Sequence, residues 1–226
     1  MQAIYFLVAA RETITLIHWI ERVKYPQNNK EHVGQSTMEY VEVDQREIQR
    51  LGGQYAFYPT AKLIEDLIRP LSPRVLDVTF GKGRFYYFYR PKLLIGSDPN
   101  KWEWIVKPDI FYQLTVWALY DKLKKGEIKL PDDITLVVVD PPRWTRCTYR
   151  KREEYNSLIG TPDLIIQYAN RTAQLLNATH LLLHYNTVPQ LEKAQPTKVV
   201  KFRYLARYLN TENKNTSYYI LYKLDI

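Results

Sequence analysis

The segment Ile134–Val139 restricts the fold more than any other part of this sequence, because every position in it is apolar or β-branched. A short continuous run of this kind predicts a strand that is buried on both faces, as strands inside parallel sheets are. The run is too short for a buried helix. We therefore expect a parallel sheet that is covered by helices on two sides.

Similar apolar runs alternate with helical segments along most of the chain. Further strands are predicted at residues 75–78, 93–98, 108–111, 180–185, 199–208 and 217–224. Helices are predicted from an N-cap at Thr60 to Pro70, over residues 114–125, and from the capped start Thr161-Pro162. This alternation predicts an α/β fold with a mostly parallel sheet, helices on both faces and a closing antiparallel hairpin.

The 226 residues, 46% of them hydrophobic, suffice for one domain of ordinary size. Residues 1–50 are interpreted as an N-terminal extension that packs on the core, and residues 51–226 as the main domain. Within the extension we predict a strand, a helix around Thr15–Val23 and a polar loop over Pro26–Thr37.

The first candidate site follows the strand at residues 75–78, where Asp77, Gly81 and Gly83 have the spacing D-x-x-x-G-x-G. Glycines at the carboxyl end of a strand let the backbone approach a ligand and turn sharply into a following helix. Two glycines are common in turns, so Asp98 strengthens the interpretation. It ends the next strand, where an acid accepts hydrogen bonds from ribose hydroxyls.

The second candidate site is Asp140-Pro141-Pro142-Arg143-Trp144, directly after the buried strand. Ligands of open α/β sheets bind at the carboxyl ends of the strands. Two prolines stiffen this turn and make Asp140 a fixed hydrogen-bond acceptor at that edge. The structural alternative is an Asp-Pro turn that only ends a strand.

Together the two sites resemble motifs I and IV of class I S-adenosylmethionine (SAM)-dependent methyltransferases. The second resembles the (D/N)-P-P-(Y/F/W) box of the exocyclic amino-methyltransferases, which act on adenine N6 or cytosine N4 of DNA, on RNA or on a protein glutamine. Residues 53–60 resemble the SAM-contacting motif that precedes motif I in many DNA amino-methyltransferases. The resemblance covers about residues 52–144. It implies the Rossmann-like class I methyltransferase fold for residues 51–226, with SAM as the methyl donor.

The resemblance also implies roles for individual residues. Asp77, Gly81 and Gly83 would cradle the methionine part of SAM, Asp98 would bind the ribose, and Asp109 would bind the adenine amino group. The full set implied to bind the cofactor is Tyr55, Phe57, Tyr58, Asp77, Thr79, Gly81, Gly83, Asp98 and Asp109. The set implied to be catalytic is Asp140, Pro141, Pro142 and Trp144.

In this interpretation Asp140 and the Pro141 carbonyl accept hydrogen bonds from the target amino group, and Trp144 stacks on a base that is flipped out or single-stranded. The chain departs from the family at Arg143, which stands where the family has its aromatic residue. Three explanations remain: Trp144 stacks through a shifted turn, the Arg143 guanidinium stacks instead, or the substrate is not a flipped base.

The formal charge of +8 is concentrated in one region. Residues 143–210 contain 11 Lys and Arg against four acids, a net charge of +7. Such a region suits a polyanion, although a solvated basic surface explains it as well. The residues predicted to hold the substrate are Arg143, Arg146, Tyr149, Arg150, Lys151 and Arg152. We predict nucleic acid as the partner, DNA in preference to RNA. If the target is DNA, the chain reads a short sequence by itself or relies on a partner protein or a homodimer for recognition.

Other classes of protein fit the sequence less well. One cysteine, Cys147, excludes a disulfide framework, and the four histidines lack metal-ligand spacing, so no metal is expected. The apolar runs are too short to span a bilayer, and we expect no membrane contact and a cytoplasmic location. Two alternatives remain: a methyltransferase that acts on protein or a small molecule, and a non-catalytic Rossmann-like protein that binds SAM or nucleic acid.

Overall fold

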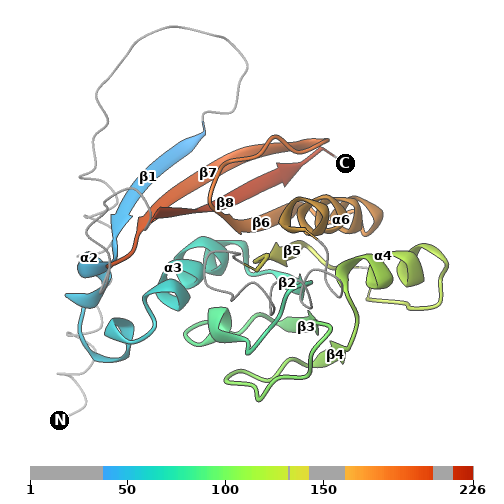
Figure 1. Cartoon of the computed structure of the whole chain (residues 1–226), viewed down its shortest axis with the longest axis horizontal. Coiled ribbons are helices and arrows are strands. Elements are labelled where there is room, and N and C mark those ends of the chain that lie inside the picture. The colour runs from blue at the N-terminus through green and yellow to red at the C-terminus, as the bar shows by residue number, and fades with distance from the viewer. Residues whose placement is uncertain (1–37, 132, 143–160, 206–215, 226) are drawn as a thin grey trace, which may run out of the picture. The chain divides into compact units, whose positions relative to one another are not determined.

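A computed structural model describes residues 38–131, 133–142, 161–205 and 216–225 of the chain. The described residues belong to one compact unit, built on an eight-stranded sheet (Figure 1). Its strands are β1 (Glu39–Asp44), β2 (Arg74–Asp77), β3 (Leu93–Ser97), β4 (Ile110–Tyr112), β5 (Leu136–Val139), β6 (His180–Tyr185), β7 (Ala194–Arg203) and β8 (Thr216–Leu224). Their order across the sheet is β1-β7-β8-β6-β5-β2-β3-β4.

Only β8 runs against its neighbours in this sheet. It pairs antiparallel with β6 and β7, whereas all the other neighbouring strands pair in parallel. The predicted parallel sheet with a closing hairpin of the last two strands is therefore confirmed. From β2 the chain moves outward to β3 and β4, and then returns to the other side of β2 as β5. The strand order reverses between β2 and β5, and ligands of open α/β sheets bind at the carboxyl side of such a reversal.

Helices cover both faces of the sheet. The α-helices are α2 (Gln45–Gln49), α3 (Pro59–Ile68), α4 (Val116–Lys124) and α6 (Pro162–Leu175). On one face, alternate strand residues such as Leu76 and Val137 form a single buried cluster with Leu119 of α4 and Ile165 of α6. The intervening residues, such as Leu136, are equally buried but lie outside this cluster, as do the apolar residues of α3. We conclude that α3 covers the opposite face.

Hydrogen-bonding side chains mark where α4 and α6 begin. Thr161 caps α6 by accepting a hydrogen bond from the Leu164 N–H, with Pro162 at the first helical position, as predicted. Thr115 caps α4 in the same way. The predicted cap at Thr60 is wrong, because α3 begins at Pro59 and is preceded by Tyr58. The fixed φ of proline suits the first position of a helix, which explains the earlier start.

Three predicted segments differ from the observed ones. No α-helix follows the glycine motif, and the connection to β3 contains only the short 3-10 helix Arg84–Tyr86. The third predicted strand, at residues 108–111, begins two residues later as β4, so Asp109 precedes it. The strand predicted at 199–208 begins earlier, at Ala194, and ends earlier, at Arg203, because the described residues Tyr204 and Leu205 are not part of it. Pro196 lies at a bulge in this strand, a position where a sheet tolerates proline.

The strand β1 was not predicted, and it lies in the segment interpreted as an N-terminal extension. It adds to the edge of the sheet by pairing in parallel with β7. Two ion pairs, Glu39–Lys198 and Glu42–Lys201, join the two strands. The strand and helix predicted within residues 1–37 lie outside the described residues.

Candidate functional site

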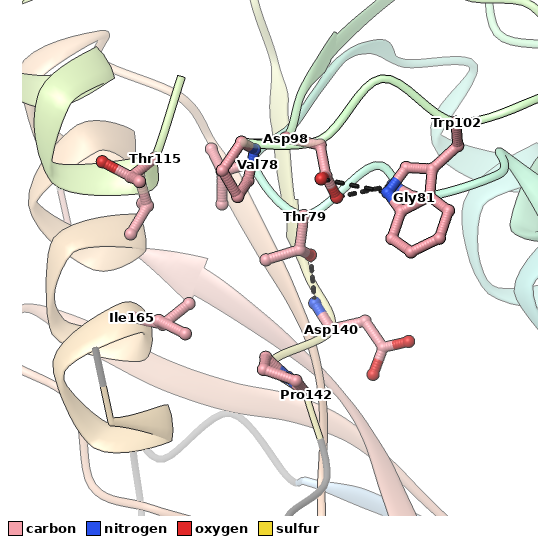
Figure 2. Close-up of a pocket in the computed structure, with 11 residues that line it drawn as sticks. Val78, Thr79, Gly81, Asp98, Trp102, Thr115, Asp140, Pro142 and Ile165 are labelled. Atoms are coloured by element: carbon pink, nitrogen blue, oxygen red, sulfur yellow. Dashed lines mark hydrogen bonds between the residues drawn. The ribbon is translucent and has the colours of Figure 1, made fainter. Parts of the chain in front are cut away.

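A pocket of about 240 Å³ lies at the carboxyl side of the reversal between β2 and β5. Its volume is near the lower end of small-ligand sites, roughly 300 Å³. Residues from the ends of β2, β3 and β5 meet there with the starts of α4 and α6 (Figure 2). The pocket is lined by Val78, Thr79, Gly81, Asp98, Pro99, Trp102, Thr115, Val116, Asp140, Pro142 and Ile165. Five predicted site residues, namely Thr79, Gly81, Asp98, Asp140 and Pro142, are thereby brought together.

Thr79 joins the two candidate motifs. Its hydroxyl oxygen accepts a hydrogen bond from the Asp140 backbone N–H at 2.6 Å (Figure 2). The same hydroxyl donates to Oδ1 of Asp77 at 3.4 Å. The turn after β5 is therefore fixed against the turn after β2 by a single side chain.

Asp77 directly precedes the pocket-lining Val78 and Thr79 and is almost inaccessible to solvent, with 3% of its surface exposed. Its Oδ1 accepts a hydrogen bond from the Thr79 N–H at 2.9 Å, and its Oδ2 accepts one from the Tyr86 hydroxyl at 2.9 Å. Burial raises the pKa of Asp77 to about 7 from an ordinary value of 3.8. The two hydrogen bonds oppose this rise, and the negative charges of Asp140 and Asp98 add to it. Three carboxylates thus converge on one site.

The two motif glycines have different surroundings, although both have left-handed backbone conformations. Gly81 lines the pocket, and the nearest atom to a Cβ built on it is the Thr79 oxygen at 3.9 Å. A Cβ on Gly83 would lie 2.4 Å from the Val106 oxygen and 2.9 Å from the Phe80 ring. Gly83 therefore gives room to the protein's own packing, and only Gly81 offers backbone to a ligand.

Asp98 lies at the end of β3, as predicted, and is held by three donors. Its Oδ2 accepts from the Gly81 N–H at 3.1 Å. Its Oδ1 accepts from the Asn100 N–H at 2.8 Å. It also accepts from the Trp102 indole N–H at 3.0 Å (Figure 2). Burial raises the pKa of Asp98, while the three hydrogen bonds oppose that rise. A carboxylate oxygen accepts about two hydrogen bonds, so Oδ2 retains capacity for one more donor.

The carboxylate of Asp140 contacts His184 of the neighbouring strand. His184 Nδ1 lies 2.8 Å from Asp140 Oδ1, and His184 Nε2 lies 3.0 Å from the Ser217 hydroxyl. The imidazole also stacks on Tyr219, with ring centroids 4.1 Å apart and an angle of 8°. The connectivity is that of a Ser-His-Asp triad, but the fully buried Ser217 cannot reach a substrate.

The structure does not bring every predicted residue to the pocket. Asp109 precedes β4 and is paired with Arg90, and it also accepts from the Leu94 N–H at 2.8 Å. Burial acts to raise the pKa of Asp109, but these two partners hold it below its usual value. Because Asp109 stands before a strand rather than after one, it does not line the pocket.

The aromatic residues of the segment 53–60 do not line the pocket either. Tyr58 stacks on Tyr87 at 4.3 Å, and Tyr55 packs against Phe88 at 4.7 Å. Phe57 is 80% exposed. Pro141 is buried and does not line the pocket, unlike its neighbour Pro142. The predicted residues Arg143, Trp144, Arg146, Tyr149, Arg150, Lys151 and Arg152 lie outside the described residues.

Sequence reasoning missed His184, which contacts Asp140, and the six remaining residues that line the pocket, namely Val78, Pro99, Trp102, Thr115, Val116 and Ile165. Trp102 lies in the connection after β3, four residues beyond Asp98, and an indole there is not distinguishable from a packed loop residue. His184 had a usable signal, because β5 and β6 are adjacent parallel strands that end together. The register pairs Val139 with Leu183, so the next two residues, Asp140 and His184, are neighbours.

The described part of the chain offers neither a metal-binding cluster nor a membrane-spanning helix. No group of three or more His, Cys, Asp or Glu residues there could hold a metal ion. None of the helices in that part has the length and apolar character needed to cross a membrane.

Comparisons with known proteins do not assign this chain to a family. No protein-family model matches the sequence, and no curated protein sequence is significantly similar to it. Among solved structures the chain is similar to YhhF of Escherichia coli, which is provisionally described as a methyltransferase. The two share 12% identity with a TM-score of 0.30, over 74% of this chain and 84% of YhhF. A likeness this distant carries no argument about fold or function.

Proposed function

We propose that this protein is a SAM-dependent methyltransferase that acts on an exocyclic amino group of a nucleic-acid base. The observation that carries the proposal is the convergence of Asp77, Asp98 and the Asp140-Pro141-Pro142 turn around one pocket at the strand reversal. Sequence motifs 57 residues apart (83 to 140) are joined there through the Thr79 hydroxyl.

The residues of the pocket fit SAM. The three carboxylates favour a cationic ligand, because each interacts with its positive charge in a partly desolvated site. The remaining acceptor capacity of Asp98 Oδ2 suits a ribose hydroxyl. Val78, Val116 and Ile165 provide an apolar wall, which suits an adenine ring. Gly81 leaves open space beside its backbone, as a close-lying ligand requires.

SAM, when bound, supplies a methyl group on a positively charged sulfur. The chain's own residues orient the acceptor: the Asp140 carboxylate accepts a hydrogen bond from the target amino group and favours a pyramidal nitrogen whose lone pair faces the pocket. A base inside a duplex cannot reach such a pocket, so the target is flipped out or single-stranded.

The charge distribution supports a nucleic-acid substrate. Residues 143–210, which begin directly after Pro142, carry the net charge of +7. In the described region, Lys82 and Arg84 are exposed next to the pocket-lining Gly81. Cations near a base pocket bind the phosphates that flank the target. We propose DNA as the first substrate to test and RNA as the second.

The direct test is transfer of radiolabelled methyl from SAM to separate pools of unmethylated DNA, transfer RNA, ribosomal RNA and protein. Label is expected in a nucleic-acid pool and is expected to disappear with Asp140→Ala. Label in the protein pool alone would move the proposal to a protein substrate. SAM binding without transfer to any pool would contradict nucleic-acid methylation and favour a small-molecule substrate or a non-catalytic binder.

The two motif glycines give a second test that separates packing from binding. Gly83→Ala is expected to lower the free energy of unfolding by about 2–4 kcal/mol, because it combines left-handed strain with overpacking. Gly81→Ala is expected to cost about 1 kcal/mol in stability but to weaken SAM binding at least about ten-fold, because its methyl group enters the pocket. Denaturant unfolding and calorimetric titration with SAM measure the two effects.

The matched control is Gly126→Ala. Gly126 has the same φ of 72° as Gly83, and no atom lies within 4 Å of a Cβ built on it. It reports the cost of the left-handed conformation alone. If Gly83→Ala destabilised no more than Gly126→Ala, the close approach to Val106 and Phe80 would be unimportant. If Gly81→Ala bound SAM like the wild type, the glycine motif would not border the SAM site.

A further inference from the structure

The side chain of His184 occupies one fixed position between Asp140 and the C-terminal hairpin. It is 8% exposed, and it contacts Asp140 at Nδ1 and Ser217 at Nε2. The Tyr204 hydroxyl also lies 3.2 Å from Nε2. Stacking on Tyr219 and the edge contact from Phe85 at 6.1 Å restrict the imidazole plane. A side chain held on both nitrogens and stacked on one face cannot rotate without breaking several contacts.

This arrangement determines which atoms of Asp140 are available to a substrate. An ionised carboxylate only accepts hydrogen bonds, so His184 Nδ1 is the donor to Oδ1. Within the described residues, no hydrogen-bond partner contacts Oδ2 of Asp140. The side chain of Asp140 is 37% exposed and lines the pocket. One oxygen is therefore held by the protein while the other remains available at the pocket.

We propose that His184 is the positioning residue of the Asp140 carboxylate, holding Oδ1 so that Oδ2 receives the amino group of the substrate. This inference rests on the proposed methyltransferase function. An unrestrained aspartate side chain can occupy several staggered orientations, whereas the hydrogen bond from a rigid imidazole selects one for Asp140. Geometry held in this way contributes to catalysis because small displacements of a catalytic group are costly.

The expected reaction assigns a separate task to each oxygen of Asp140. The amino nitrogen of the base forms a bond to the methyl carbon while the carbon–sulfur bond breaks and its electron pair stays on sulfur. The nitrogen then carries a positive charge, and one of its protons passes to Oδ2 of Asp140. His184 keeps its proton on Nδ1 throughout, and the Asp140 carboxyl group later releases the acquired proton to water. His184 therefore acts through Asp140 and does not touch the substrate.

The variants His184→Leu and His184→Asn test the proposal. Leucine removes the hydrogen bond to Asp140, and kcat is expected to fall about 10- to 100-fold with the affinity for SAM unchanged within about two-fold. Asparagine places an amide N–H near the position of Nδ1 and is expected to recover activity to within about five-fold of the wild type. His180→Gln is the matched control, since His180 lies on the same strand but does not line the pocket.

An NMR measurement tests the hydrogen bond between His184 and Asp140 without depending on turnover. The Nδ1–H proton of His184 is expected to give an NMR signal protected from exchange with water, because it is buried and hydrogen-bonded. That signal is expected to vanish in His184→Asn, which assigns it, and in Asp140→Ala, which removes its acceptor. Persistence of the signal in Asp140→Ala would contradict the hydrogen bond on which the inference depends.

The outcomes separate this inference from the proposed function. Absence of methyl transfer by the wild type would overturn the function, and the NMR result would still decide whether His184 holds Asp140. Transfer by the wild type together with full activity of a folded His184→Leu would overturn the positioning role alone. If His184→Leu failed to fold, His184→Asn would decide. The positioning role would also be overturned if His184→Asn folded but was inactive and its Nδ2 amide protons exchanged freely with water.

Discussion

Asp140→Ala is expected to lower kcat for methyl transfer by on the order of 10²- to 10⁴-fold, the range for loss of a general acid or base. The substitution removes both the acceptor for the amino hydrogen and the destination of the proton. SAM binding is expected to weaken by less than about ten-fold, because the Asp140 side chain is 37% exposed and its charge acts largely through water. Single-turnover transfer and calorimetric titration measure the two quantities.

Asp140→Asn distinguishes the two tasks assigned to this carboxylate. An amide oxygen still accepts a hydrogen bond from the substrate if the amide N–H faces His184, whose Nδ1 must then act as the acceptor. The amide cannot take up the released proton. We expect activity between that of the wild type and that of Asp140→Ala, with the largest deficit at low pH, where water and hydroxide accept protons least readily.

The control for both variants is Asp121→Ala, which removes an exposed aspartate from α4, where it does not line the pocket. It is expected to leave transfer and binding unchanged. Activity of Asp140→Ala close to that of Asp121→Ala would show that the Asp-Pro-Pro turn is structural, as an Asp-Pro turn ending a strand would be.

The strands near the site were predictable because buried strands consist mostly of apolar residues, which the sequence shows directly. The strands β2, β3, β5 and β6 lie inside the sheet, so most of their residues are buried and apolar, and the observed bounds agree with the prediction within two residues. The meeting of Asp77, Asp98 and Asp140 followed from the same pattern. Parallel strands end at a common edge, and each of these residues ends a strand or follows one directly.

The strand β1 could not be predicted in the same way, because its pairing depends on contacts far apart in the sequence. It faces β7 across about 160 residues, and half of its side chains are acidic. Those acids find partners in Lys198 and Lys201 only after the sheet has formed. Charged residues are usual on edge strands, where they discourage pairing with other chains. Because of these acidic residues, β1 lacks the apolar pattern by which the other strands were predicted.

The individual roles of residues within the motifs were the least predictable part of the site. The D-x-x-x-G-x-G spacing placed Gly81 and Gly83 together, yet only packing distinguishes them. The Phe80 ring lies against the backbone of Gly83 and of Gly96, and a Cβ on either glycine would collide with it. Two of the glycines near the motif are therefore explained by a buried phenylalanine rather than by a ligand.

Asp77→Asn is expected to have effects on stability and on binding that both depend on pH. The pKa of Asp77 is about 7 in the folded protein and near 3.8 in an unfolded chain, so folding takes up a proton between these values. Well below pH 3.8 the group is protonated in both states and does not affect the free energy of unfolding. As the pH rises from 4 to 7, the buried carboxylate destabilises the folded protein progressively, and above pH 7 that destabilisation is complete.

Asparagine at position 77 removes this penalty while its amide oxygen still accepts from the Thr79 N–H. Relative to the wild type, the variant is therefore expected to gain stability as the pH rises from 4 to 7, with a slope of at most about 1.4 kcal/mol per pH unit, and to keep that gain above pH 7. Urea unfolding of both proteins at pH 5, 6, 7 and 8 measures the difference. A difference that did not change with pH would show that Asp77 does not titrate in this window.

Binding is expected to respond in the opposite direction, because the ionised carboxylate that destabilises the fold attracts the cationic ligand. SAM affinity of the wild type is expected to rise about ten-fold from pH 6 to pH 8 beyond any change that Asp77→Asn shows, since titration of SAM itself is common to both proteins. S-adenosylhomocysteine, which lacks the sulfonium charge, is expected to bind the two proteins with a much smaller difference. If Asp77→Asn weakened the binding of SAM and of S-adenosylhomocysteine equally, Asp77 would support the pocket through its contacts with Thr79 and Tyr86 rather than through its charge. A loss confined to SAM would mean that the acid beneath the glycine motif is kept, at a cost in stability, for the charge that it presents to the ligand.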